Sequence, residues 1–261
     1  VSEWSEPAWF EMGLLDEDDW SASWISAPTL FDWRAVDGRR KEIAKDAAPE
    51  LPEPAPIFRK EFSVEKKIVS ARAYISGLGY YELLMNGDKV GDRVLEPAFT
   101  RYDKRTLYSV YDVTSHVRNG DNALGVLLGN GWYDMFSRGV WGFDHAPWRA
   151  DPTFLLQLEI KFDDGSTERI ISDESWKCTP GPIIFTELRQ GEWYDARREQ
   201  HGWASPHFDE SKWTNPRTVR GPEGRLAATT MPPTKERRTF KPKSIKEAAS
   251  GVYVVDFGQN M

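Results

Sequence analysis

Hydrophobic and polar residues alternate with a period of about two through the middle of the chain, which is the pattern of half-buried β-strands. Residues 56–64 read PIFRKEFSV and residues 70–77 read SARAYISG. In the second run Ala71, Ala73 and Ile75 share one face, and polar or larger side chains occupy the other. We therefore expect a strand in each of these two runs.

A β-hairpin is predicted within residues 80–95. The pair Asn86-Gly87 interrupts an apolar run, and a type I′ turn requires positive φ at both of its central residues. Further strands are expected at 106–114, 122–132, 153–162 and 167–172, with a turn at 118–122. Short strands at this spacing, with few helical patterns, predict an all-β fold of the sandwich or jelly-roll type.

The two ends of the chain differ from this pattern. Residues 28–56 are rich in Pro, Ala and charge, so an insertion with one short helix at 40–48 is expected, and a helix start is expected within 14–20. The sequence predicts four parts of the chain: the end of a preceding domain at 1–23, a sandwich at 24–221, a linker at 222–250 and the first strand of a following β domain at 251–261. The sequence is expected to be truncated within a neighbouring domain at each end. Alternatively, the first and last strands pair with the central sandwich.

Composition narrows the range of partners. The formal net charge is −7 and basic residues form no long patch, which argues against a nucleic-acid partner. No run of about 18 apolar residues predicts a membrane span. Cys178 is the single cysteine, and no signal-peptide pattern opens the chain, so a reducing, cytoplasmic location is favoured. The first residue is Val1 rather than Met, which leaves the localisation open.

The twelve tryptophans have two interpretations. Trp combines a large apolar face with a polar N–H, so it suits both the core of a sandwich and a platform that contacts a ligand. The segment 127–152, LLGNGWYDMFSRGVWGFDHAPWRADP, concentrates aromatic residues with Asn and Asp after an apolar strand. It is either a ligand-gripping surface or a long loop that packs on its own core.

A search for catalytic patterns assigns no catalytic residue. The G-x-S-x-G elbow and the phosphate-binding loop are absent, and Gly77 and Gly79 lack the third glycine of a dinucleotide fingerprint. His201 and His207 stand near Asp209 without the spacing of a zinc motif. Carboxylates are numerous, but no two of them are singled out as a hydrolytic acid and base.

The segment 189–199, RQGEWYDARRE, places carboxylates beside arginines and aromatic residues. A guanidinium beside a carboxylate can pair with it in a bidentate way. Glu192, Tyr194, Asp195 and Arg197 are therefore expected to form an interface that orients a neighbouring domain or part of a ligand site. The alternative is a salt-bridged strand at the edge of a domain.

Several motifs carry a family resemblance when read in order. GLGYYEL, NGDKVGD, VLEPAFTRYDKR, GDNALGVLLGNGWY, GEWYDAR and FDESKW together resemble the N-terminal β-sandwich of bacterial α-L-rhamnosidases of glycoside hydrolase family 78. The opening segment resembles the junction after that family's fibronectin-like domain. The resemblance implies a jelly-roll sandwich similar to galactose-binding and carbohydrate-binding modules.

The resemblance also implies a function. That family hydrolyses terminal α-L-rhamnosides with inversion, and its catalytic carboxylates lie in an (α/α)₆ barrel that follows the regions matched here. The chain is thus expected to be a non-catalytic accessory part that supports a C-terminal catalytic domain. The resemblance does not decide whether the chain on its own has enzyme activity.

In some members of the family the equivalent module binds rhamnose through calcium, which makes a rhamnose-containing glycan a candidate partner and calcium the one candidate cofactor. The implied calcium ligands are Asn86, Asn130 and Asp134. The implied carbohydrate contacts are Asn130, Trp132, Tyr133, Asp134 and Trp141. Asn86 is also explained by its turn. The alternative to an accessory part is a self-sufficient, calcium-dependent glycan-binding module.

Overall fold

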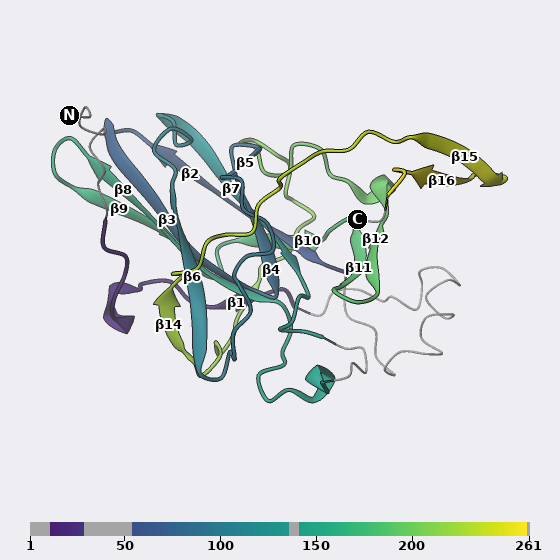
Figure 1. Cartoon of the computed structure of the whole chain (residues 1–261). Helices are drawn as coiled ribbons and strands as arrows, with labels where there is room; N and C mark the ends of the chain where they lie inside the picture. The colour runs from purple at the N-terminus through teal and green to yellow at the C-terminus, as the bar shows by residue number, and fades with distance from the viewer. Residues whose placement is uncertain (1–10, 29–53, 136–140, 260–261) are drawn as a thin grey trace, which may run out of the picture.

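Two β-sheets packed face to face form the body of the protein (Figure 1). The computed structural model describes residues 11–28, 54–135 and 141–259. The seven-stranded sheet contains β1 (Ile25–Ser26), β3 (Ile68–Leu78), β6 (Arg105–Asp112), β8 (Thr153–Phe162), β9 (Thr167–Ile171), β13 (Arg217–Thr218) and β14 (Arg225–Ala228). Its strands lie in the order β13-β1-β8-β3-β6-β14, and β9 pairs with β8. In the order β10-β2-β7-β4-β5, the five-stranded sheet contains β2 (Pro56–Val64), β4 (Tyr80–Met85), β5 (Asp88–Lys89), β7 (Gly120–Gly129) and β10 (Lys177–Pro180).

Two hairpins lie outside these sheets. One joins β11 (Ile183–Glu187) to β12 (Gly191–Tyr194), and the other joins β15 (Ser244–Ala249) to β16 (Val252–Asp256). Short 3₁₀ helices are η1 (Glu17–Asp19), η3 (Phe143–His145) and η4 (Ala196–Arg198), and the described residues contain no α-helix. The expected fold class, an all-β jelly-roll sandwich, is confirmed. No helix in the described segments is long and apolar enough to cross a membrane.

Aromatic contacts join the two sheets through the core. The rings of Phe58 on β2 and Phe154 on β8 pack edge to face with centroids 5.0 Å apart. Trp176 packs on Phe154 at 5.3 Å and donates its indole N–H to the carbonyl of Ile171 at 2.7 Å. Trp176 is fully buried, and its one polar group is paired, so it adds apolar burial without an unsatisfied donor.

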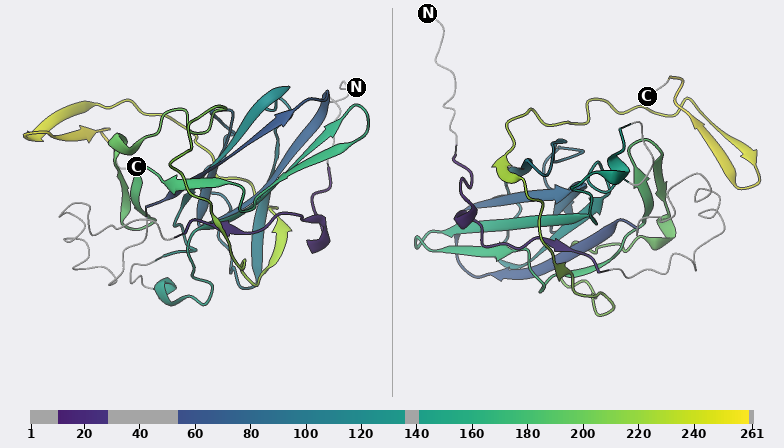
Figure 2. Two further views of the ribbon diagram at one scale, coloured as in Figure 1. Left: turned by 180° about the vertical axis from the view of Figure 1, so that it is seen from behind. Right: turned by 90° about the horizontal axis from the view of Figure 1, so that it is seen from below.

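The outer faces of both sheets are also covered (Figure 2). Residues 11–24 cross the seven-stranded sheet, where Trp20 packs on Tyr74 and Tyr108 and the Tyr108 hydroxyl donates to the carbonyl of Leu14 at 2.6 Å. On the five-stranded sheet, the segment that follows β12 packs against β2 and β7, where a Cβ on Gly125 would come within 2.8 Å of the Trp203 ring. This explains why polar-face residues of β2 and β3 are buried although the sequence alternates.

The strand predictions agree closely with these elements. β2 has the expected bounds, and the hairpin of β4 and β5 turns at Asn86 and Gly87, whose φ angles are 54° and 90°. β8 and β9 form the hairpin expected at 153–172. β7 ends at Gly129 rather than at 132, because residues 130–134 leave the strand in a turn.

The flanks differ more from expectation. The segment 222–250, expected as a linker, contains β14, which pairs in parallel with β6, and β15, which pairs with β16. The helix start expected within 14–20 is a single 3₁₀ turn, in which the Asp19 carboxylate accepts from the backbone N–H groups of Leu15 and Asp16. The insertion and its helix at 40–48 lie outside the described residues, as do residues 1–10.

Candidate functional site

An aromatic cluster forms at the end of the sandwich where β7 gives way to the loop after it. Its members share ring contacts between 5.3 and 6.4 Å and are Phe99, Tyr102, Trp132, Tyr133, Trp141, Phe143 and Trp148. Tyr102 and Tyr133 are buried in the cluster, whereas Trp141 is 62% exposed and Phe99 is 40% exposed. The cluster thus has a packed base and an open aromatic surface.

The open surface carries a cation. The guanidinium of Arg189, at the turn between β11 and β12, lies over the Trp141 ring at 4.4 Å from its centroid. Such a contact holds the indole in a fixed orientation, because the cation is attracted to the face of the ring. Trp132 lies beside Trp141 with ring centroids 6.2 Å apart. The two indoles are inclined at 52° to each other and present apolar faces of the kind that can contact the C–H face of a sugar ring.

Two buried polar atoms of the cluster have no hydrogen-bond partner among the described residues. They are the hydroxyl oxygen of Tyr102 and the indole nitrogen of Trp148. Burial raises the pKa of Tyr102, so its hydroxyl remains a donor. A donor buried without a partner costs free energy, and a bound water or ligand group would remove that cost.

A polar network underlies the cluster. Asn130 is buried and donates from Nδ2 to Oδ2 of Asp134 at 2.7 Å, and the guanidinium of Arg149 lies 3.3 Å from Oδ1 of Asp134. Burial raises the pKa of Asp134 to about 7, although Arg149 and Asn130 act in the opposite direction. Gly79 packs against the Asn130 carbonyl so closely that a Cβ would lie 1.8 Å from that oxygen. These contacts fix the turn after β7 in place.

The expected calcium ligands do not fit one calcium ion. Asn86 lies at the far end of β4, where it donates to the carbonyl of His116 and to the side chain of Asn122. Asn130 lies beside Gly79, at the other end of that strand, and seven residues of extended chain span about 23 Å. Asn130 and Asp134 are close together, but Arg149 already occupies the charged side of that carboxylate. Among the described residues, no group of three or more His, Cys, Asp or Glu side chains is arranged to hold a metal ion.

The expected carbohydrate contacts divide into two groups. Trp132 and Trp141 lie on the surface of the cluster, while Tyr133, Asn130 and Asp134 are buried beneath it. Phe99, Phe143 and Trp148 also belong to the aromatic cluster, and none of them was predicted from the sequence as a contact residue. Phe99 follows β4 and β5 along the chain and precedes β6, so only the tertiary fold brings it to this loop. Aromatic density in the loop was the one signal that pointed to Phe143 and Trp148.

The expected interface residues lie on and after β12. Asp195 pairs in a bidentate way with Arg197, at 2.8 and 2.7 Å, and accepts the backbone N–H of Arg197 as the N-cap of η4. Tyr194 donates its hydroxyl to Glu199 at 2.6 Å, and Glu192 is exposed on β12. The strand ends at Tyr194, and the chain turns there into η4.

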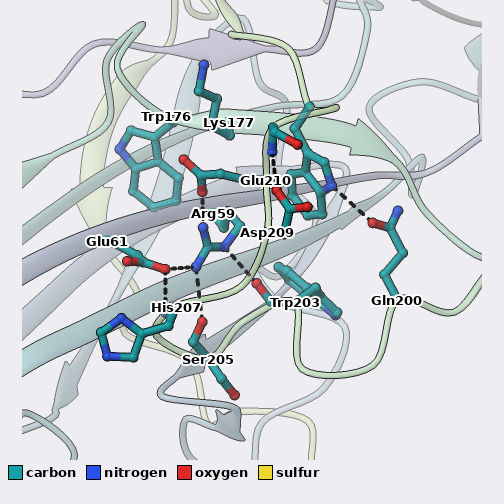
Figure 3. Close-up of polar contacts among 12 residues, drawn as sticks. Arg59, Glu61, Trp176, Lys177, Gln200, Trp203, Ser205, His207, Asp209 and Glu210 are labelled. Atoms are coloured by element: carbon teal, nitrogen blue, oxygen red, sulfur yellow. Dashed lines mark hydrogen bonds and ion pairs between the residues drawn. The ribbon is translucent and has the colours of Figure 1, made fainter.

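Arg59 anchors the segment after η4 onto the five-stranded sheet (Figure 3). Its fully buried guanidinium donates to the carbonyls of Trp203 and Ser205 at 2.8 and 3.0 Å, and it forms ion pairs with Glu61 and Glu210. The charge and the donors of Arg59 are thereby met by fixed partners, which lets the cation be buried. These contacts tie the segment 200–213 to β2 at Trp203, Ser205 and Glu210.

Comparisons with known proteins agree on one family. The family description Alpha-L-rhamnosidase N-terminal domain matches residues 66–238. An α-L-rhamnosidase of Formosa agariphila is 37% identical over 277 residues, and the alignment covers 100% of this chain and 28% of that protein. The chain therefore spans less than a third of the length of this relative.

Solved structures give the same result. The α-L-rhamnosidase from Dictyoglumus thermophilum superposes with a TM-score of 0.77 at 41% identity, over 96% of this chain and 27% of that one. The Streptomyces avermitilis α-L-rhamnosidase complexed with L-rhamnose gives a TM-score of 0.70 at 39% identity, over 80% of this chain and 20% of that one.

Proposed function

This chain belongs to the family of α-L-rhamnosidase N-terminal domains, and we propose that it is the accessory, non-catalytic part of an enzyme that hydrolyses terminal α-L-rhamnosides. The observation that carries the proposal is the extent of the match: all of this chain aligns with 28% of the relative's length. The hydrolytic carboxylates are assigned to the remainder of such an enzyme. The sandwich supplies a rigid body on which a catalytic domain rests.

The exposed apolar residues are the surface best suited to contact that remainder. Val252, Tyr253, Val254 and Val255 on β16 are each 44% to 61% exposed in a hairpin that has no apolar cover of its own. Glu192, Tyr194, Asp195 and Arg197 offer a polar surface with fixed side chains. Exposed apolar side chains and ordered polar side chains are both typical of an interface between domains.

Hydrolysis of 4-nitrophenyl α-L-rhamnoside tests this proposal. The full-length protein from which the chain derives is expected to release nitrophenol, and the 261-residue chain is expected to release none. Release of nitrophenol by the chain alone would overturn the proposal if replacing one of the chain's own carboxylates, as in Asp134→Asn, abolished that release. Release that persisted unchanged in several such variants would indicate a contaminating enzyme, which chromatography on a second resin would remove.

A second candidate function is glycan binding by the chain itself. The exposed indole of Trp141, fixed by Arg189 beside Trp132, supports it. Calorimetry with L-rhamnose, with and without calcium, tests this function. Heat that is lost in Trp141→Ala but retained in Tyr253→Ala would support binding at the aromatic cluster. Calcium-dependent heat that is lost in Asn130→Ala would support the calcium-linked form, and a flat titration would exclude the aromatic cluster as a rhamnose site.

A further inference from the structure

A cavity of about 340 Å³ lies on the outer face of the five-stranded sheet. Its floor is made by Ile57, Leu84 and Leu127, whose strands β2, β4 and β7 are neighbours in that sheet. Pro182, Tyr194 and residues 199–203 border the cavity, with Trp203 as one wall. The cavity shares no lining residue with the aromatic cluster, and of the interface residues named above only Tyr194 lines it.

The polar groups of the cavity are mainly acceptors. Glu82 accepts from the ammonium of Lys89 at 2.7 Å, which offsets its charge, and Glu199 accepts the hydroxyl of Tyr194 at 2.6 Å. His201 Nδ1 lies 3.6 Å from the other carboxylate oxygen of Glu199. Among the described residues that line the cavity there is no Lys or Arg and there are two glutamates, so a phosphate or another anion would meet unfavourable electrostatics there.

Gln200 also lines the cavity. The side-chain carbonyl of Gln200 accepts the indole N–H of Trp213 at 3.0 Å, which leaves the amide nitrogen of Gln200 as a donor for other groups. The cavity therefore offers both donor and acceptor groups above an apolar floor. A ligand with several hydroxyl groups and an apolar face matches this combination, because each hydroxyl can donate and accept.

The walls are formed before any ligand binds. The carbonyls of Trp203 and Ser205 are held by the buried guanidinium of Arg59 (Figure 3), and the edge of the Trp203 ring lies so close to Gly125 that a Cβ there would come within 2.8 Å of it. A site whose walls are already ordered loses little conformational entropy on binding. Small-molecule sites are of this type, and their volumes begin near about 300 Å³.

We infer that this cavity binds one neutral sugar ring, with the C–H face of the ring on Leu84 and Leu127 and its hydroxyls on Glu199 and Gln200. Trp203 packs at the edge of the ring. A deoxyhexose suits the apolar floor best, because its methyl group adds to the apolar face. The inference goes beyond the proposed function, since it requires neither a catalytic domain nor the aromatic cluster.

Fluorine NMR of the full chain labelled with 5-fluorotryptophan tests the inference, with Trp203→Phe and Trp141→Phe used to assign two resonances. L-rhamnose is added up to about 50 mM, since a single ring in a preformed site binds at the millimolar level. The Trp203 resonance is expected to move in a saturable way. Glu199→Gln is expected to weaken binding by roughly tenfold, because a charged acceptor is lost. The matched control Glu223→Gln, outside the cavity, is expected to have no effect.

Each other outcome has a definite meaning. A Trp203 resonance that stays unmoved by L-rhamnose, D-galactose and D-glucose would overturn the inference. A larger and tighter response to choline than to any sugar would overturn it in favour of a cation site. Movement of the Trp141 resonance alone would place sugar at the aromatic cluster and would also count against the cavity. If the full-length protein released no nitrophenol, that result would contradict the proposed function and would leave the inference about the cavity unaffected.

Discussion

The sandwich and the β15–β16 hairpin are built from similar sequence but have opposite environments. Phe154, Leu156 and Leu158 on β8 are fully buried between the two sheets. On β16, the run Val252–Asp256 is as apolar as β8, yet each of its residues is exposed. Figures 1 and 2 show this hairpin away from the sheets, at the end of an extended connection.

The comparison separates strand formation from burial. A local apolar run is enough to form a strand, and both regions form one. Burial depends on whether other segments supply a facing surface, and a two-stranded hairpin alone is marginally stable in water. The sandwich is covered on both outer faces by segments distant in sequence, whereas the hairpin has no cover within the described part of the chain.

The largest effect should come from the core. Trp176→Ala removes a fully buried indole and leaves the carbonyl of Ile171 without its donor, so we expect a loss of about 3–5 kcal/mol in the free energy of unfolding. The matched change in the hairpin, Tyr253→Ala, should cost less than about 0.5 kcal/mol because that side chain is exposed. Denaturation in guanidinium chloride measures both, and equal losses would contradict the comparison.

The second-largest loss of stability should follow the replacement of Arg59, which anchors the segment 200–213. Arg59→Met leaves the carbonyls of Trp203 and Ser205 unpaired and two carboxylates without their cation, so we expect a loss of about 3 kcal/mol. The control is Arg220→Met, because the ion pair of Arg220 with Glu223 is exposed on both sides and should add little. Equal effects of the two variants in thermal unfolding would show that the Arg59 cluster is not an anchor.

A third test uses pH. The folded-state pKa of Asp134 is raised from 3.8 to about 7, so the folded protein binds a proton that the unfolded chain has released between those values. The contribution of Asp134 to stability is thus complete below about pH 4 and is lost as the pH rises to about 7, with a slope of at most about 1.4 kcal/mol per pH unit. Asp134→Asn should flatten the stability of the protein over this range.

Asp195 provides the control of opposite sign. Its pKa is lowered to about 2 by the hydrogen bond with Arg197, so its contribution is present above about pH 4 and is lost as the pH falls toward 2. Asp195→Asn should therefore leave the pH 4 to 7 range unchanged. A slope that persists in Asp134→Asn would assign the pH dependence to another group.

The smallest effect is expected from the hairpin as a whole. Deletion of residues 240–261 should change the free energy of unfolding of the sandwich by less than about 0.5 kcal/mol, because none of the residues described within 240–259 is buried. Hydrogen exchange should show fast exchange in β15 and β16 and slow exchange in β3 and β8. A loss above about 1 kcal/mol would mean that the hairpin stabilises the sandwich.

Local sequence rules predicted most strands of the sandwich. The alternation in β2 and β3, and the Asn86-Gly87 turn, depend on neighbours in sequence, so the sequence alone was enough to find them. The parallel pairing of β14 with β6 could not be found in this way. Residues 225–228 carry no strong apolar pattern, and their partner lies about 120 residues earlier.

The candidate site was predictable only in part. Trp132 and Trp141 were identified because aromatic residues concentrate in one loop, but Phe99 and Arg189 reach the cluster from other segments. Asn86 and Asn130 were both expected as calcium ligands, but the pairing of β4 with β7 places them at opposite ends of β4. The cavity below Trp203 could not be predicted, because its floor and walls come from four separate stretches of chain.

The edge strands of the two sheets have a consequence for behaviour in crowded solution. Each sheet ends in short strands: β13 and β5 have two residues each, and β10 ends at Pro180. Short or proline-terminated edges offer few free backbone groups to another molecule, so the sandwich is protected against edge-to-edge aggregation. Its hairpin of exposed valines has no such protection, and self-association of the isolated chain should begin there.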